Sequence, residues 1–173
     1  GFAAFHQRGS GATTCLEAVE EILEVGRRSR CPVHHSHEET AGPEAWKLVE
    51  TIIRREEAAV REGIDLSMDV IPYTWVCTTM LAIYPPWSLE GGVEAFIGRL
   101  QDPMLRARMK REVGTASPAW PPWQDNGWIM NLVREVGWDR IHVGHVNRAA
   151  NRDTILKSLR ELGELRGKDP FEA

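Results

Sequence analysis

Two histidines in the first part of the chain have the spacing expected of metal ligands. His6 and His37 each lie at or near the carboxyl end of a predicted strand, and one predicted helix separates the two strands. If these strands are neighbours in a parallel sheet, their ends lie about 4.8 Å apart, which suits two imidazoles that share one ion at about 2.1 Å from each nitrogen. Two histidines do not complete a catalytic zinc site, which usually has three protein ligands. The alternative is that His6 is a partly buried residue hydrogen-bonded to a neighbour.

The other four histidines are weaker candidates. Strict alternation along the second strand places His35 and His37 on one face and His34 on the other. A third ligand would therefore come from His35, from water or from a neighbouring chain. We expect His34 at the surface or against a helix. His142 and His145 lie near the end of a later predicted strand, where a lone histidine is more often a hydrogen-bonded core or rim residue than a ligand.

Three acidic residues lie close to these candidates in the sequence. Glu38 and Glu39 follow His37 directly, so either carboxylate could orient an imidazole or act as a base. Solvated loop charge is the favoured interpretation of both. Asp69 ends a predicted third strand, where it could hold a turn or line the site.

The elements that position these residues alternate between strand and helix. Strands are predicted at residues 1–6, 32–37 and 64–70, because these runs are apolar or alternate with period two. Helices are predicted from the Thr14-x-x-Glu17 capping box to about Gly26, and from Gly42-Pro43 to Gly63. The apolar side of the second helix is predicted from Trp46, Val49, Ile53 and Val60. This order is typical of parallel βαβ units.

The alternation of strand and helix stops after the third predicted strand and resumes near the end of the chain. Residues 75–138 are predicted as an inserted, mostly helical subdomain, with one helix opened by Asp102-Pro103. Residues 139–173 are predicted as a strand over 140–146 and a helix opened by the Ser158-x-x-Glu161 capping box. Residues 1–74 form the βαβαβ part. The chain begins in a strand without an initiator Met and ends on a helix-start signal, Asp169-Pro170, so we expect an excerpt of a longer protein.

The charge and cysteine content of the chain limit the kinds of partner that it is expected to bind. The net charge of −4 comes from charges of both signs spread along the chain, so neither nucleic acid nor a membrane surface is an expected partner. The three cysteines are scattered, which favours a reducing, cytoplasmic setting. A small-molecule substrate is expected, together with self-association through the unpaired edges of an incomplete sheet.

Several short blocks together resemble the N-acyl-D-amino-acid deacylase (D-aminoacylase) family of the amidohydrolase superfamily. The blocks span nearly the whole chain, and no single one is specific. They are His6-Gln7-Arg8, Leu16-Glu17-Ala18, Ser36-His37, Ala41-Gly42-Pro43-Glu44, Asp69-Val70-Ile71-Pro72-Tyr73, Pro85-Pro86-Trp87-Ser88-Leu89-Glu90-Gly91-Gly92, Lys157-Ser158-Leu159 and Arg166-Gly167-Lys168-Asp169-Pro170.

The resemblance implies an α/β fold, a partial (β/α)8 barrel with the helical insertion, and a zinc-dependent hydrolase of N-acyl-D-amino acids or related N-acyl compounds. By this resemblance His6 and His37 match two zinc ligands. The family's remaining ligands and its general base fall outside this chain, so the excerpt alone is expected to be inactive. The alternative is a non-catalytic barrel remnant that acts as a binding or assembly module.

Three positions depart from the family where it holds the substrate carboxylate. The family's Lys is Glu39 here, a Tyr is Ile71, and a small hydroxyl residue is Cys77. By resemblance these are substrate-binding positions. Because Glu39 repels an anion where a lysine attracts it, a free carboxylate at that position of the substrate is doubtful.

Overall fold

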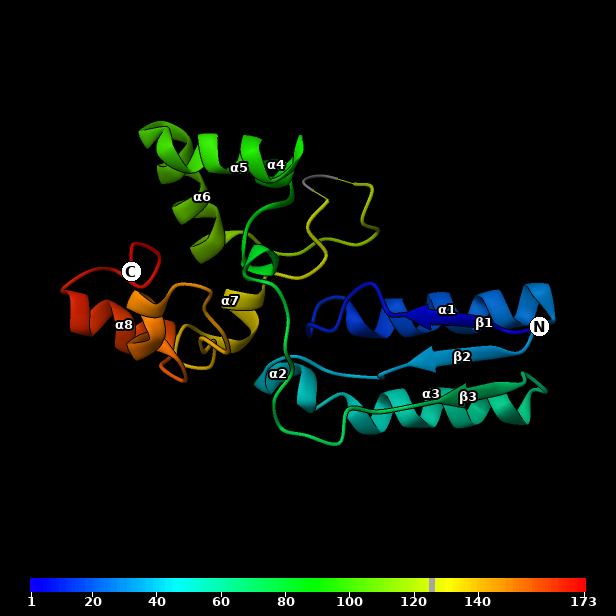
Figure 1. Ribbon diagram of the computed structural model, residues 1–173. Coiled ribbons are helices and arrows are strands. Elements are labelled where there is room, and N and C mark those ends of the chain that lie inside the picture. Colours follow the sequence, from blue (N-terminus) through cyan, green and yellow to red (C-terminus); the bar gives the residue numbers. More distant parts are fainter. Residues whose placement is uncertain (125–126) are drawn as a thin grey trace. The chain divides into compact units, whose positions relative to one another are not determined.

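The chain folds into two compact units in the computed structural model, which describes residues 1–124 and 127–173 (Figure 1). The first unit contains residues 1–76 and 117–130, and the second contains residues 77–116 and 131–173. The elements of the first unit are β1 (Ala3–His6), α1 (Cys15–Ser29), β2 (Val33–Ser36), α2 (Pro43–Trp46), α3 (Val49–Arg61) and β3 (Leu66–Met68).

The first unit is built on a parallel sheet in the order β1-β2-β3. Ala4 pairs with His34 and His6 pairs with Ser36, while His34 also pairs with Ser67 of β3. The helices α1 and α3 run alongside the strands and contact each other, so they cover one face of the sheet (Figure 1). The predicted parallel βαβαβ order is therefore confirmed, whereas closure of these strands into a barrel stays a prediction.

The two faces of the sheet differ in character. Val33 and His35 point to the helix-covered face and are buried. His34 and Ser67 lie in register on the opposite face, which His6 shares two residues further along β1 from Ala4, the partner of His34. The apolar core lies between the helices and the covered face. It consists of Cys15, Val19, Leu23, Ile52, Ala59 and Ile64.

Helix α1 forms where the apolar spacing predicts it, but it does not begin with the predicted capping box. The Thr14 side chain makes no capping hydrogen bond. Instead the buried Thr14 hydroxyl donates to the backbone oxygen of Ile129 at 2.9 Å. The helix also continues past Gly26 to Ser29. Gly26 fits inside it because a Cβ there would lie 2.8 Å from Ile64, so the two elements approach closely.

The second predicted helix is wrong in its extent and in its buried side. It is two helices, α2 and α3, and the buried residues of α3 are Ile52, Glu56 and Ala59. The residues expected to be buried include Trp46, Ile53 and Val60, and all three are exposed. The hydrogen bond between Glu56 and His35 of β2 accounts for the difference, because it directs the Glu56 side of α3 onto the sheet.

The second unit is mostly helical, whereas the division into an insertion over residues 75–138 and a returning segment over 139–173 stays a prediction. Its helices are η1 (Met80–Ile83), α4 (Pro86–Leu89), α5 (Gly92–Gln101), α6 (Pro103–Thr115), α7 (Leu132–Val136), η2 (Ala149–Thr154) and α8 (Leu159–Arg166). The Asp102 carboxylate caps α6 by accepting from two backbone N–H groups, and the Ser158–Glu161 capping box of α8 is complete. Both local helix-start predictions are therefore confirmed.

The strand predicted over residues 140–146 does not form. A single antiparallel bridge joins His142 to Ser158. Backbone groups of Ile141 and Val143 bond to those of residues 156–159, immediately before α8, rather than to a neighbouring strand. The alternating pattern is therefore satisfied locally. Within the described residues, no helix is long and apolar enough to cross a membrane.

Candidate functional site

The structure brings the rings of His6 and His37 together at one end of the sheet. His6 is the last residue of β1, and His37 follows β2 directly. His6 Nδ1 lies 2.8 Å from His37 Nε2, and the ring centroids are 4.5 Å apart. The carboxyl ends of two neighbouring parallel strands therefore carry two facing imidazoles, in the arrangement that the sequence predicts.

The predicted role of His35 as a third ligand is wrong. Its ring lies on the helix-covered face with 0% of the side chain exposed, and Nδ1 is 2.7 Å from Glu56 Oε1. Alternation fails at His37 because this residue has a φ of 40°, which turns the chain out of the extended conformation. His34 lies on the open face, as predicted from its opposition to His35. There it contacts Asp69.

Asp69 fixes the turn that carries His37. One carboxylate oxygen accepts from the backbone N–H of His37, and the other lies 2.9 Å from His34 Nε2. The hydrogen bond with His34 lowers the pKa of Asp69, and the bond from the His37 N–H lowers it further. The sequence allows Asp69 either to hold a turn or to line the site, and in the structure it holds the turn.

The two glutamates that follow His37 differ in their surroundings. Burial raises the pKa of Glu38, and the neighbouring Glu56 carboxylate raises it further. Glu39 has one carboxylate oxygen 3.2 Å from the Ser10 hydroxyl and the other 3.9 Å from His37 Nδ1. The interpretation of Glu39 as solvated loop charge is therefore wrong, because its side chain is only 26% exposed and Oε1 accepts from Ser10.

Two polar residues of this site were missed from the sequence. Gln7 and Ser10 are both buried, and the Gln7 amide donates to the Ser10 hydroxyl at 3.0 Å. The same amide also donates to the backbone oxygen of Glu39. The available signal was their position within four residues after His6, at the strand end where active sites of parallel α/β folds are built.

The remaining candidate positions are Ile71 in the first unit and Cys77, His142 and His145 in the second. Ile71 is partly buried in the segment that follows β3. Cys77 is a free, exposed cysteine at the start of the second unit. In that unit His142 makes the backbone bridge described above, and exposed His145 lies 3.2 Å from the Asn147 side-chain oxygen.

The histidine pair suits two positions of a zinc site. Imidazole nitrogens are common zinc ligands, and two of them on one tetrahedral ion at 2.0–2.1 Å lie about 3.3 Å apart. The observed 2.8 Å between His6 and His37 differs from that by about half an ångström, within reach of small side-chain rotations. Among residues 1–124 and 127–173, no group of three His, Cys, Asp or Glu side chains is placed to hold a metal.

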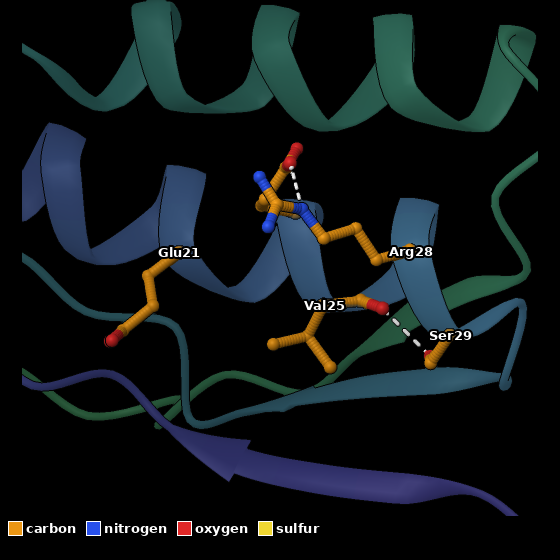
Figure 2. Close-up of a pocket in the computed structure, with 5 residues that line it drawn as sticks. Glu21, Val25, Arg28 and Ser29 are labelled. Carbon is orange, nitrogen blue, oxygen red and sulfur yellow. Dashed lines mark hydrogen bonds and ion pairs between the residues drawn. The ribbon is translucent and has the colours of Figure 1, made fainter.

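A surface depression on α1 offers no comparable chemistry. Figure 2 shows Glu21, Val25, Arg28 and Ser29 among the residues that line it. Its polar groups already have partners. Arg28 pairs with Glu24 at 2.6 Å, and the Ser29 hydroxyl donates to the Val25 carbonyl at 2.7 Å. Glu21 pairs with Arg8 at 2.8 Å. The histidine pair is therefore the candidate site.

Comparisons with known proteins point to one kind of relative. No protein-family model matches the chain. Over 64 residues the chain is 31% identical to the N-acyl-D-glutamate deacylase of Alcaligenes xylosoxydans xylosoxydans. The aligned region covers 37% of this chain and 13% of the relative. A crystal structure of N-acyl-D-glutamate deacylase from Bordetella bronchiseptica, complexed with zinc and a phosphonate inhibitor that mimics the tetrahedral intermediate, matches with a TM-score of 0.58.

The structural match covers 99% of this chain and 25% of the solved structure, at 15% identity, and so concerns the fold. The chain thus spans a quarter or less of the length of either relative. Because the sequence relative and the structural relative are both N-acyl-D-glutamate deacylases, the predicted resemblance to the N-acyl-D-amino-acid deacylases is confirmed.

Proposed function

We propose that this chain supplies two zinc ligands, His6 and His37, to an amidohydrolase that hydrolyses the linear amide of N-acyl-D-amino acids or related N-acyl compounds. The observation that carries the proposal is the 2.8 Å approach of the two ring nitrogens at the carboxyl ends of adjacent parallel strands. The zinc-bound deacylase among the relatives supports the choice of metal.

The residues of this chain would bind and orient rather than move protons. A bound zinc ion supplies Lewis acidity and lowers the pKa of water. His6 holds its position through the β1–β2 pairing, and His37 holds its position through the bond from its backbone N–H to Asp69. The general base and the remaining metal ligands are proposed to lie outside residues 1–173.

The substrate is proposed to lack a free carboxylate near Glu39. This glutamate replaces the family's lysine, and its carboxylate is engaged with Ser10 on the His37 side of the site. An anionic group brought next to it would meet repulsion instead of an ion pair. Ile71 and Cys77 would add an apolar side chain and a thiol at the other two substrate-binding positions.

Zinc titration of the 173-residue chain tests the proposal. We expect weak but measurable binding by calorimetry, which His6→Ala and His37→Ala each remove, because one imidazole does not hold the ion. The two losses should not add, since both variants destroy the same site. His145→Ala is the matched control, because it deletes an exposed imidazole of the second unit. Equal zinc binding by His37→Ala and the wild type would overturn the proposal.

A second candidate function is a non-catalytic binding or assembly module. It is favoured by the exposed apolar side chains on and after β3, an edge strand of the sheet: Met68, Val70, Tyr73, Trp75 and Val76. Exposed apolar surface beside an unpaired strand edge promotes self-association. Light scattering at about 0.1 mM, where such surfaces usually reveal themselves, should show a dimer or larger species. A monodisperse monomer would count against this candidate.

A further inference from the structure

The ring of His37 has a second nitrogen that is not accounted for by its contact with His6. Nε2 faces His6, so Nδ1 is directed away from it on the other side of the ring. In the part of the chain that the structure describes, Nδ1 is shielded from solvent and has no hydrogen-bond partner. A buried polar atom without a partner is uncommon, so a nearby group that could serve it is significant.

The nearest charged group is the carboxylate of Glu39. Its Oε2 lies 3.9 Å from His37 Nδ1. That separation is too long for a hydrogen bond, but a carboxylate rotation that shortens it by about 1 Å would give an ordinary one. Because the carboxylate approaches Nδ1 and not Nε2, Glu39 is placed behind the imidazole and not beside His6 as a further ligand.

The Glu39 carboxylate is held in this place by residues that follow β1. The hydroxyl of Ser10 donates to Oε1 at 3.2 Å, and the Gln7 amide donates to the Glu39 backbone oxygen. Gln7 and Ser10 are themselves buried and hydrogen-bonded to each other at 3.0 Å. These bonds occupy Oε1 and the backbone of Glu39 and leave Oε2 directed toward His37.

We propose that Glu39 is a positioning residue for His37: its carboxylate accepts a hydrogen bond from Nδ1–H and so fixes the tautomer whose Nε2 lone pair faces His6. This inference rests on the proposed zinc site. Histidines that bind metals usually donate their other ring N–H to a carboxylate or carbonyl, which sets the ring orientation and raises the basicity of the ligating nitrogen. Glu39 then replaces the substrate contact of the family's lysine with a contact to the ligand itself.

Two measurements on the 173-residue chain test the role of Glu39. Zinc affinity should fall about 10- to 100-fold in Glu39→Ala, the range seen when the partner of a ligating histidine is removed, and less in the isosteric Glu39→Gln. Nitrogen-15 chemical shifts of the metal-free chain should show His37 protonated on Nδ1 in the wild type and a mixture of tautomers in Glu39→Ala. The tautomer is read without metal, so it reports on Glu39 independently of zinc binding.

Control variants separate this inference from the zinc site itself. Glu38→Gln makes the same chemical change one residue away and should leave zinc affinity and the His37 tautomer unchanged. Ser10→Ala frees the Glu39 carboxylate without removing it, so it should weaken zinc binding in the same direction as Glu39→Gln. Loss of zinc binding in His37→Ala, with full affinity and an unchanged tautomer in Glu39→Ala, overturns the positioning role and leaves the zinc site standing. If the wild type takes up no zinc, the zinc site fails, and the tautomer still decides the role of Glu39.

Discussion

The buried pair of His35 and Glu56 should be a main determinant of the stability of the first unit. His35 Nδ1 lies 2.7 Å from Glu56 Oε1, and the two side chains are 0% and 1% exposed. Within the described part of the chain, the outer atoms of the pair, His35 Nε2 and Glu56 Oε2, have no other hydrogen-bond partner. Each side chain therefore depends on the other for its polar contact.

Removing one member should cost more than the pair contributes. Glu56→Ala leaves the imidazole buried without its partner, and breaking such a pair from one side costs about 3–5 kcal/mol. Glu56→Gln keeps the shape and one acceptor, so we expect a loss of about 1–3 kcal/mol in the free energy of unfolding. Replacing both residues with apolar side chains of similar size, as in His35→Phe with Glu56→Leu, should recover much of the loss, because no unpaired polar group remains.

Urea denaturation followed by tryptophan fluorescence and circular dichroism measures these differences. The matched control is Glu57→Gln, which alters an exposed neighbour on the same helix whose ion pair with Arg61 spans 3.7 Å. It should change the free energy of unfolding by less than about 0.5 kcal/mol. The reasoning is refuted if Glu56→Gln costs no more than Glu57→Gln, or if the double apolar variant loses the sum of the two single losses.

Three further predictions concern pH, packing and capping. The pKa of Asp69 is lowered in the folded chain, so its contribution to stability is present above the unfolded pKa of about 3.9 and is lost as the pH falls through the folded value. Asp69→Asn should therefore lower the melting temperature at pH 7 and make little difference near pH 2, and an equal effect at both pH values would contradict this. Gly26→Ala should destabilise the chain by about 1–3 kcal/mol, because the new methyl group would lie 2.8 Å from a core side chain. A Cβ added at Gly98 would meet nothing within 4 Å, so Gly98→Ala should raise the free energy of unfolding by about 0.5–1 kcal/mol. If urea denaturation ranks the two variants the other way, the packing argument is wrong. Ser158→Ala removes the complete capping box of α8 and should cost about 1 kcal/mol by the same assay, whereas an unchanged midpoint would mean that the cap contributes nothing.

Features that depend on a few neighbouring residues could be predicted from the sequence. The parallel order of β1, β2 and β3 follows from apolar runs separated by helical segments. The confirmed caps of α6 and α8 use side chains within three residues of the backbone they serve. In each case the interacting groups are close in the chain, so spacing alone specifies the contact.

Predictions failed where the partner is distant in the chain. Thr14 has the sequence of a capping box, but its hydroxyl bonds to Ile129, and the buried side of α3 is set by Glu56 with His35 of β2. The alternating residues 140–146 find partners in residues 156–159 and not in a strand. Local patterns state what a segment can form, and the tertiary structure decides which of the available partners satisfies it.

In the candidate site, too, some features follow from the local sequence and others depend on residues that are distant in the chain. The sequence by itself determined that His6 and His37 stand at the ends of neighbouring strands, because strand order and strand length fix those positions. Only the tertiary structure decided which way the His37 ring points, since alternation applies while the backbone is extended, and the turn at His37 with a φ of 40° ends it. That turn is held by Asp69, which is 32 residues away, and Glu39 is held behind the ring by the buried Gln7 and Ser10. Hydrogen bonds between segments far apart in the sequence therefore set the geometry on which the proposed chemistry depends.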